Sequence, residues 1–128
     1  MNCINCNGII SKKSKYCSNK CQKEYEYKEY VKRWKNGKEN GMRGEYQISL
    51  HVKTYLLNKY NNKCAKCGWG EKNIYTGKIP LEVEHIDGNY KNNNEENLII
   101  LCPNCHSLTS TYKGANLNRG RKERKKYN

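Results

Sequence analysis

The sequence has little material for a hydrophobic core. It contains no Phe, only 35% of its 128 residues are hydrophobic, and its mean hydropathy is −1.14. Apolar burial alone gives a small, polar chain little to set against the entropy lost on folding. No run approaches the ~20 apolar residues of a membrane span, so we expect no membrane association. The composition predicts one small domain, or two very small ones, that need another stabilising element.

Acidic residues are also few. Twelve Asp and Glu stand against 25 Lys and Arg, which gives a net charge of +13. Such an excess is typical of proteins that contact a polyanion, most often nucleic acid. A generally solvated basic surface would have the same composition, and the charge says nothing about catalysis.

Eight cysteines can supply the missing stabilisation. The N-terminus has no apolar run like that of a secretion signal, so we expect a cytoplasmic protein, in which disulfide bonds are rare. The cysteines form two quartets of paired residues, a spacing that predicts two structural zinc ions rather than disulfide bonds. The first quartet is Cys3, Cys6, Cys17 and Cys21, and the second is Cys64, Cys67, Cys102 and Cys105.

Four segments follow from the pattern along the chain. Apolar residues at helical spacing predict one helix over about residues 18–35 and another over about residues 50–60. Glycines between these helices indicate a flexible connection. The segments are an N-terminal zinc module with its helix (1–36), a Gly-containing linker (37–49), a core (50–117) and a basic C-terminal tail (118–128).

The C-terminal residues are strongly basic, with Glu123 as the one acid after residue 112. Such runs often bind phosphates on contact, although a tail that only aids solubility is the alternative. The expected DNA-binding residues are Lys113, Arg119, Arg121, Lys122, Arg124, Lys125 and Lys126.

The second quartet encloses a strand, a turn-rich loop, a second strand and the start of a helix. Residues 80–86 alternate apolar and polar side chains and predict a strand. Residues 98–101 are a short apolar run that suits a second strand. Pro103 is tolerated in the first turn of a helix, so a helix is expected to begin near it.

These elements bring a carboxylate and two imidazoles within one zinc-closed loop. A zinc ion on Cys105 would fix the direction of the neighbouring His106 ring, and Glu84 and His85 lie at the end of the first strand. Two imidazoles and a carboxylate held in this way could bind a second ion and supply a general base.

The runs LEVEHIDGN and NNNEENLIILCPNCHSLT resemble the HNH endonucleases, whose core is the ββα-metal motif. His85 matches the first His of that motif, Asn97 the central Asn and His106 the second His. The second quartet matches the zinc-bearing members, and the first resembles small zinc modules that precede some phage-encoded relatives. The resemblance covers about residues 50–117 and implies a small, zinc-stabilised α+β fold.

The resemblance also implies an activity: metal-dependent hydrolysis of double-stranded DNA that leaves a 5′-phosphate and a 3′-hydroxyl, by nicking or double-strand cleavage. His85 would activate water as the general base, and Glu84 and His106 would bind one Mg²⁺ or Mn²⁺. Asn97 would brace the loop that orients His85, and there are two further candidates for this bracing, Asn89 and Asn93. Together with the Lys-, Asn- and Tyr-rich composition, it suggests a phage-encoded or mobile enzyme acting in a bacterial host.

Two positions depart from the family pattern. Ser110 stands where some relatives have another His one helical turn after the second His, and Glu84 stands where many have Asp. The absence of that His implies a weaker, more solvent-filled metal site, or one that prefers Mg²⁺ to softer ions. Glu84 is a longer ligand than Asp with the same chemistry.

Other interpretations stay open. His106 could ligate the structural zinc, although four cysteines already fill that site. His85 could be an ordinary strand residue, and Glu84 could face solvent. A non-catalytic, double-zinc nucleic-acid-binding module would explain the charge and the cysteines, and a protein-interaction module would explain the cysteines alone. The sequence does not predict the oligomeric state.

Overall fold

A computed structural model describes residues 1–10 and 13–109 of the chain. The chain divides into two compact units, Met1–Glu39 and Asn40–Asn128. Among the described residues, no helix combines the length and apolar character that a membrane crossing requires. The expected DNA-binding residues near the C-terminus lie outside the described residues: Lys113, Arg119, Arg121, Lys122, Arg124, Lys125 and Lys126.

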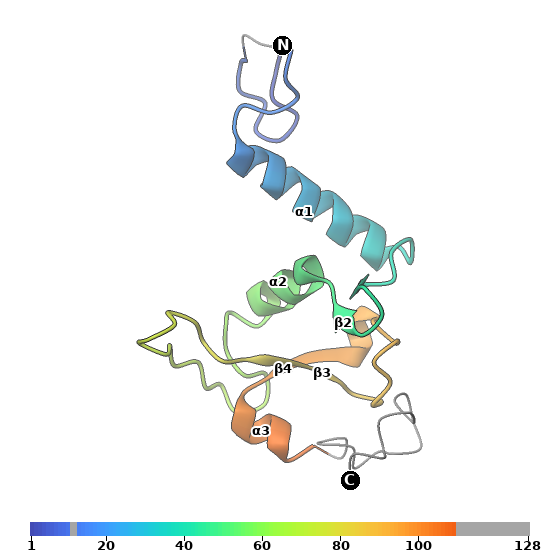
Figure 1. The fold of residues 1–128 in the computed structure, drawn as a ribbon, viewed down its shortest axis with the longest axis vertical. Coiled ribbons are helices and arrows are strands. Elements are labelled where there is room, and N and C mark those ends of the chain that lie inside the picture. The colour runs from blue at the N-terminus through green and yellow to red at the C-terminus, as the bar shows by residue number, and fades with distance from the viewer. Residues whose placement is uncertain (11–12, 110–128) are drawn as a thin grey trace. The chain divides into compact units, whose positions relative to one another are not determined.

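The N-terminal unit consists of a loop that carries the first quartet and one long helix, α1 (Asn19–Lys35; Figure 1). Ser18 caps this helix, because its hydroxyl accepts a hydrogen bond from the Cys21 backbone N–H at 3.2 Å. Side-chain caps of this kind satisfy the unpaired N–H groups of the first turn. The predicted helix is confirmed, and two of its apolar residues, Val31 and Trp34, are buried.

A small hairpin lies in the segment that was predicted to be a linker. Strands β1 (Met42–Arg43) and β2 (Gln47–Ile48) pair antiparallel. Gly44, with φ +73°, begins the turn between them, in the left-handed region that favours glycine. The Ser49 N–H donates to the Gly41 carbonyl at 2.7 Å and closes the base of the hairpin. Each strand is too short to leave an alternating pattern in the sequence.

The rest of the second unit is a two-stranded sheet between two helices. α2 contacts β4, α3 contacts both strands, and Figure 1 shows the two helices on opposite sides of the strand pair. These elements confirm a small α+β fold with the predicted strand–loop–strand–helix order. They are α2 (Leu50–Lys59), β3 (Glu82–His85), the 3₁₀ helix η1 (Glu95–Asn97), β4 (Leu98–Leu101) and α3 (Pro103–Ser107).

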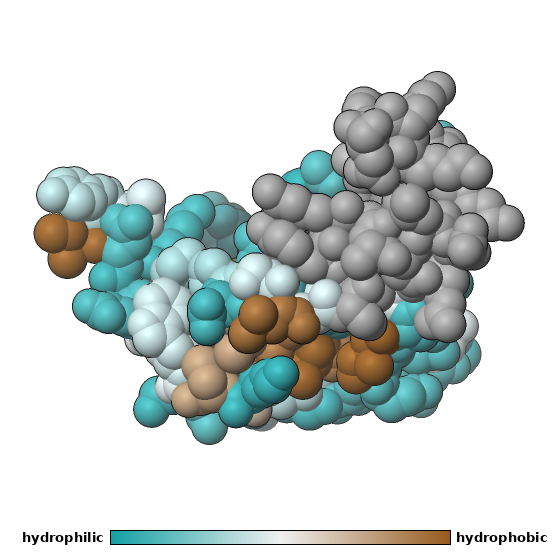
Figure 2. All heavy atoms as spheres, turned by 90° about the horizontal axis from the view of Figure 1, so that it is seen from below, coloured by the Kyte–Doolittle hydropathy of each residue, from teal (hydrophilic) through white to brown (hydrophobic). Residues whose placement is uncertain are grey.

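The core of this unit lies where α2 covers β4. Val52 and Leu56 of α2 are fully buried, as are Leu98 and Ile100 of β4. This small core is consistent with the low hydrophobic content. The face drawn in Figure 2 is largely hydrophilic, with apolar residues in small groups.

The register of the sheet places the candidate site residues at its end. β3 and β4 run antiparallel, with Glu84 opposite Ile99 and His85 opposite Leu98. His85 is therefore the last residue of β3, and Leu98 is the first of β4. The loop that joins them, residues 86–97, begins directly at His85.

Candidate functional site

The second quartet has the geometry of a tetrahedral metal site. All eight cysteines of the chain are free of disulfide bonds, and the four sulfurs of this quartet lie within 4.8 Å of one another. The Cys67 and Cys102 sulfurs are 3.7 Å apart. This agrees with the separation of about 3.8 Å between sulfurs that bind a tetrahedral zinc ion through Zn–S bonds of about 2.3 Å. The donor set and its spacing fit one zinc ion with no open coordination position.

Backbone contacts of the second quartet join the two ends of the core. The Ala65 N–H donates to the Ile100 carbonyl at 2.9 Å, which ties the first cysteine pair to β4. The Cys102 sulfur caps α3 by accepting from the Cys105 N–H at 3.4 Å. The quartet thereby connects the segment that begins at Cys64 to β4 and to the first turn of α3.

The thiols of this quartet differ strongly in acidity. Burial raises the pKa of Cys64, but hydrogen bonds from the backbone of Cys102 and Cys67 outweigh it and bring that pKa down to about 6. Burial and the neighbouring Cys102 and Cys67 sulfurs raise the pKa of Cys105 to about 12. The Cys64 thiolate thus forms readily, whereas the Cys105 thiolate needs a cation beside it, as a metal-thiolate site provides.

The first quartet repeats this arrangement in the N-terminal unit. The Cys17 sulfur lies 3.6 Å from that of Cys6 and 3.4 Å from that of Cys21. The backbone N–H of Cys6 lowers the pKa of Cys3 to about 6 against the effect of burial, while hydrogen bonds with Cys21 and Cys6 raise the pKa of Cys17 to about 12. This quartet also fits a closed tetrahedral ion.

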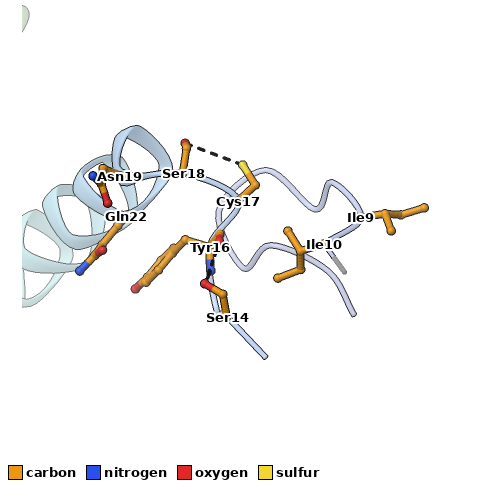
Figure 3. Close-up of a pocket in the computed structure, with 8 residues that line it drawn as sticks. All are labelled: Ile9, Ile10, Ser14, Tyr16, Cys17, Ser18, Asn19 and Gln22. Atoms are coloured by element: carbon orange, nitrogen blue, oxygen red, sulfur yellow. Dashed lines mark hydrogen bonds between the residues drawn. The ribbon is translucent and has the colours of Figure 1, made fainter. Parts of the chain in front are cut away.

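An open hollow of about 470 Å³ lies beside the first quartet (Figure 3). The described residues of its wall contribute hydroxyl, amide, thiol and apolar groups but no histidine or carboxylate, so they lack the groups of a hydrolytic site. The lining residues are Ile9, Ile10, Ser14, Tyr16, Cys17, Ser18, Asn19 and Gln22.

Glu84 and His106 meet on the α3 side of the sheet. The Nδ1 atom of His106 lies 3.0 Å from Oε2 of Glu84. Glu84 is only 8% exposed, so the interpretation that it faces solvent is wrong. A carboxylate and an imidazole are suitable ligands for a divalent ion. Neighbouring ligands of an octahedral ion, each about 2.1 Å from the metal, lie about 3.0 Å apart, so this pair fits such an ion.

The loop after His85 is organised by Asp87 and Asn97. Oδ1 of Asp87 accepts from the Asn89 N–H at 2.8 Å and from Nδ2 of Asn97 at 3.0 Å, and Oδ2 accepts from Nδ2 of Asn92 at 2.8 Å. Oδ1 of Asn97 in turn accepts from the Asp87 N–H at 3.1 Å. The buried Asn97 amide therefore joins the two ends of the loop.

The folded loop stabilises the charged form of Asp87. Burial raises its pKa, but donors from Asn92, Asn89 and Asn97, together with the nearby His85, outweigh burial and hold the pKa below its ordinary value. A lowered carboxyl pKa stabilises the fold at pH values above the unfolded pKa of about 3.9. That contribution is lost as the pH falls through the lower pKa of the folded state.

Replacing Asp87 is therefore expected to destabilise the loop. Asp87→Asn leaves one oxygen acceptor and places an amide against the Asn92 amide, so we expect unfolding at neutral pH to become easier by about 1–3 kcal/mol, the scale of a lost hydrogen bond to a charged group. Urea unfolding between pH 3 and 7 measures this. Equal stability of the two proteins at pH 7 would contradict it, and at pH 3 the difference should shrink.

The His85 ring is held by another residue of the loop. Its Nε2 atom lies 2.6 Å from Oδ1 of Asn93, and Nδ2 of Asn93 donates to the Asn40 carbonyl at 3.1 Å. Asn93 is 5% exposed. Asn89 makes a different contact, since its Oδ1 accepts from the Lys91 N–H at 3.0 Å.

The structure thus separates the sequence-predicted residues into neighbouring groups. Glu84 contacts His106, and the His85 ring forms a hydrogen bond with Asn93. Asn97 forms hydrogen bonds within the loop instead. Sequence reasoning missed Asp87 and Asn40. The Asp87-Gly88-Asn89 turn signal marks where Asp87 lies, whereas nothing in the sequence points to the Asn40 carbonyl.

Comparison with known proteins identifies the family of this region. The family model for the HNH endonuclease matches residues 64–111, from the first cysteine of the second quartet to just beyond α3. These residues belong to the HNH endonuclease family. In this HNH domain, β3, the loop, β4 and α3 form the strand–strand–helix core that carries Glu84, His85, Asn97 and His106.

A phage protein shares more of the chain. Over 97 residues the chain is 40% identical to the H-N-H endonuclease F-TflIV of Escherichia phage T5, an alignment that covers 72% of this chain and 40% of the relative. The chain therefore spans well under two thirds of that relative's length. No solved structure matches the chain.

Proposed function

We propose that this protein is a metal-dependent DNA endonuclease that hydrolyses phosphodiester bonds, with one active site in the HNH domain. The observation that carries the proposal is the 3.0 Å approach of Glu84 to His106 beside the end of β3, where His85 is the next residue. Consecutive Cα atoms lie about 3.8 Å apart, so the backbone of His85, the candidate base, adjoins that of Glu84, the candidate metal ligand. The family match supports the reaction class.

Each side chain has a role that its contacts favour. Glu84 and His106 would hold one Mg²⁺ or Mn²⁺, which, when bound, stabilises negative charge on the phosphate and on the departing oxygen. His85 accepts a proton from the attacking water, whose oxygen bonds to phosphorus while the bond from phosphorus to the 3′-oxygen breaks. The departing 3′-oxygen takes a proton from solvent water, which leaves a 5′-phosphate and a 3′-hydroxyl. Asn97 braces the loop through Asp87 and Asn92, so that the end of β3 keeps its orientation.

The remaining parts of the protein would stabilise the fold and hold the substrate. The two quartets would carry structural zinc, one in the N-terminal module (residues 1–36) and one in the core (residues 50–117), with residues 37–49 between them. Double-stranded DNA is the proposed substrate, held in part by the basic tail (residues 118–128) and the charge of +13. One site per chain would nick one strand, and two chains would be needed to cut both. The phage relative suggests the cytoplasm of a bacterial host as the place of action.

Cleavage of a supercoiled plasmid tests the proposal. The zinc-loaded protein should convert the plasmid to the open-circular form with Mg²⁺ or Mn²⁺ and not without them. If the protein binds DNA but never nicks it with any divalent ion, the non-catalytic zinc module is the better explanation, because the charge and the cysteines support binding alone. DNA affinity that is missing, or that does not fall steeply with salt, would favour a protein-interaction module.

The carboxylate of Glu84 should set the affinity for the catalytic ion. Glu84→Gln keeps the shape of the side chain and removes its charge, so we expect the Mg²⁺ concentration for half-maximal nicking to rise at least about 10- to 100-fold, the range found when even outer-sphere partners are lost. Nicking rates over a series of Mg²⁺ concentrations measure it.

A matched control lies two residues away on the same strand. Glu82 is exposed, so Glu82→Gln removes the same charge without touching His106. It should leave the Mg²⁺ dependence unchanged. If wild type and Glu84→Gln show the same dependence of nicking rate on Mg²⁺ concentration, Glu84 is not a ligand of the catalytic ion.

A further inference from the structure

The contacts of Asn93 fix which nitrogen of His85 carries a proton. A carbonyl oxygen only accepts hydrogen bonds, so the group of Asn93 that faces the Asn40 carbonyl at 3.1 Å must be its NH₂. The amide oxygen then faces the ring, 2.6 Å from Nε2 of His85. Since that oxygen also only accepts, Nε2 must donate.

A neutral imidazole carries one N–H, so a proton on Nε2 leaves the lone pair on Nδ1. We propose that Asn93 is a positioning residue that selects this tautomer of His85 and directs Nδ1 toward the attacking water. The proposal rests on the proposed function, because it needs His85 as the base. It gives Asn93 a task different from that of Asn97, whose amide contacts Asp87 and the Asn92 carbonyl.

The contacts of Asn93 extend beyond the HNH motif to the residue before the β1–β2 hairpin. The Asn40 carbonyl orients the Asn93 amide, and Oδ1 of Asn40 accepts from the Met42 N–H at 2.9 Å at the start of β1. The Gly41 carbonyl accepts from the Ser49 N–H at the same open end of the hairpin. The segment before and through the hairpin, residues 40–49, therefore supplies the carbonyl that orients Asn93 and, through it, the His85 ring.

Burial of Asn93 favours the observed orientation of its amide. Asn93 is 5% exposed, so an unpaired donor or acceptor at this position would lack water as a substitute partner. A flip of the amide would set its NH₂ against a ring N–H and its oxygen against the Asn40 carbonyl. The contact with the Asn40 carbonyl would become repulsive, so the observed orientation is the one that satisfies this carbonyl.

The ring protons of His85 in the zinc-loaded protein test the proposal directly. Proton–nitrogen NMR at about pH 8, where an ordinary histidine is neutral, distinguishes Nε2–H from Nδ1–H, and His85→Gln assigns the signals among the three histidines. We expect a slowly exchanging proton on Nε2 of wild-type His85. A proton on Nδ1 would overturn the proposal, whatever the variants do.

Variants add the functional side of the test. Asn93→Leu has a similar shape without polar atoms, and we expect it to lose the protected ring proton and to lower kcat about 100-fold at little change in KM, the scale for a misplaced catalytic group. Asn93→Asp still offers an acceptor and should keep the proton on Nε2. Asn94→Ala is the matched control, since the Asn94 side chain makes no cap hydrogen bond, and it should change neither readout.

The two readouts separate the two proposals. If Asn93→Leu keeps the protected ring proton and the wild-type kcat, Asn93 does not position the base. If wild type shows the Nε2 proton and its dependence on Asn93 but never nicks DNA, the contact is correctly assigned and the endonuclease proposal fails.

Discussion

His85→Ala is expected to lower the rate of plasmid nicking by about 10²- to 10⁴-fold, the contribution typical of a general base. The residue lies at the end of β3 with its ring held at one nitrogen by Asn93. The substitution removes the base without removing Glu84, His106 or a cysteine. Zinc content, DNA affinity and the thermal unfolding transition should therefore stay close to those of wild type.

A second histidine provides the control for this experiment. His51 lies in α2, away from the motif in sequence. His51→Ala should nick DNA at the wild-type rate. A comparable loss of activity in both variants would point to a general effect of histidine removal, and wild-type activity in His85→Ala would exclude His85 as the base.

Cys102→Ser is expected to abolish folding of the HNH domain. Serine is a good helix N-cap, so the variant keeps the capping function that the Cys102 sulfur performs for α3 and loses the metal ligand. Structural zinc contributes about 10–16 kcal/mol in small zinc domains, which is comparable to the whole stability of about 5–15 kcal/mol of an ordinary domain. Loss of one zinc ion per chain, of the circular-dichroism melting transition and of nicking should occur together.

The first quartet offers the matched comparison. Cys6→Ser should also lose one zinc ion per chain, but from the N-terminal unit, whose internal contacts are separate from those of residues 40–128. The melting transition of the HNH domain should remain. A folded, active Cys102→Ser protein would show that the HNH domain folds without the second quartet and that zinc is not its main stabilising element.

Much of the fold follows from local patterns. The spacing of the apolar residues predicted α1 and α2, and the apolar run at Leu98–Leu101 predicted β4 at its observed bounds. The cysteine pairs predicted both quartets, because ligand pairs with two or three residues between them leave a recognisable spacing. Such features depend on residues that are close in the chain.

Other features depend on the path of a loop and have no such pattern. The β1–β2 hairpin has two-residue strands, and its glycines suited a flexible linker equally well. Glu84 has the strand alternation of an exposed residue, and it is buried because α3 places His106 against it. The contact from His85 to Asn93 spans an irregular loop, so sequence position alone could not choose Asn93 over Asn89 or Asn97.

The chemical ends of the nicked strand distinguish hydrolysis at His85 from other kinds of strand breakage. The zinc-loaded wild-type protein with Mg²⁺ should produce open-circular plasmid that DNA ligase reseals without prior treatment, because hydrolysis by a water activated at His85 leaves a 5′-phosphate beside a 3′-hydroxyl. The same reaction with His85→Ala should leave the plasmid supercoiled. Nicks that ligase cannot reseal would contradict the proposed bond cleavage, and intact plasmid with a protein that binds both DNA and two zinc ions would contradict the enzyme itself.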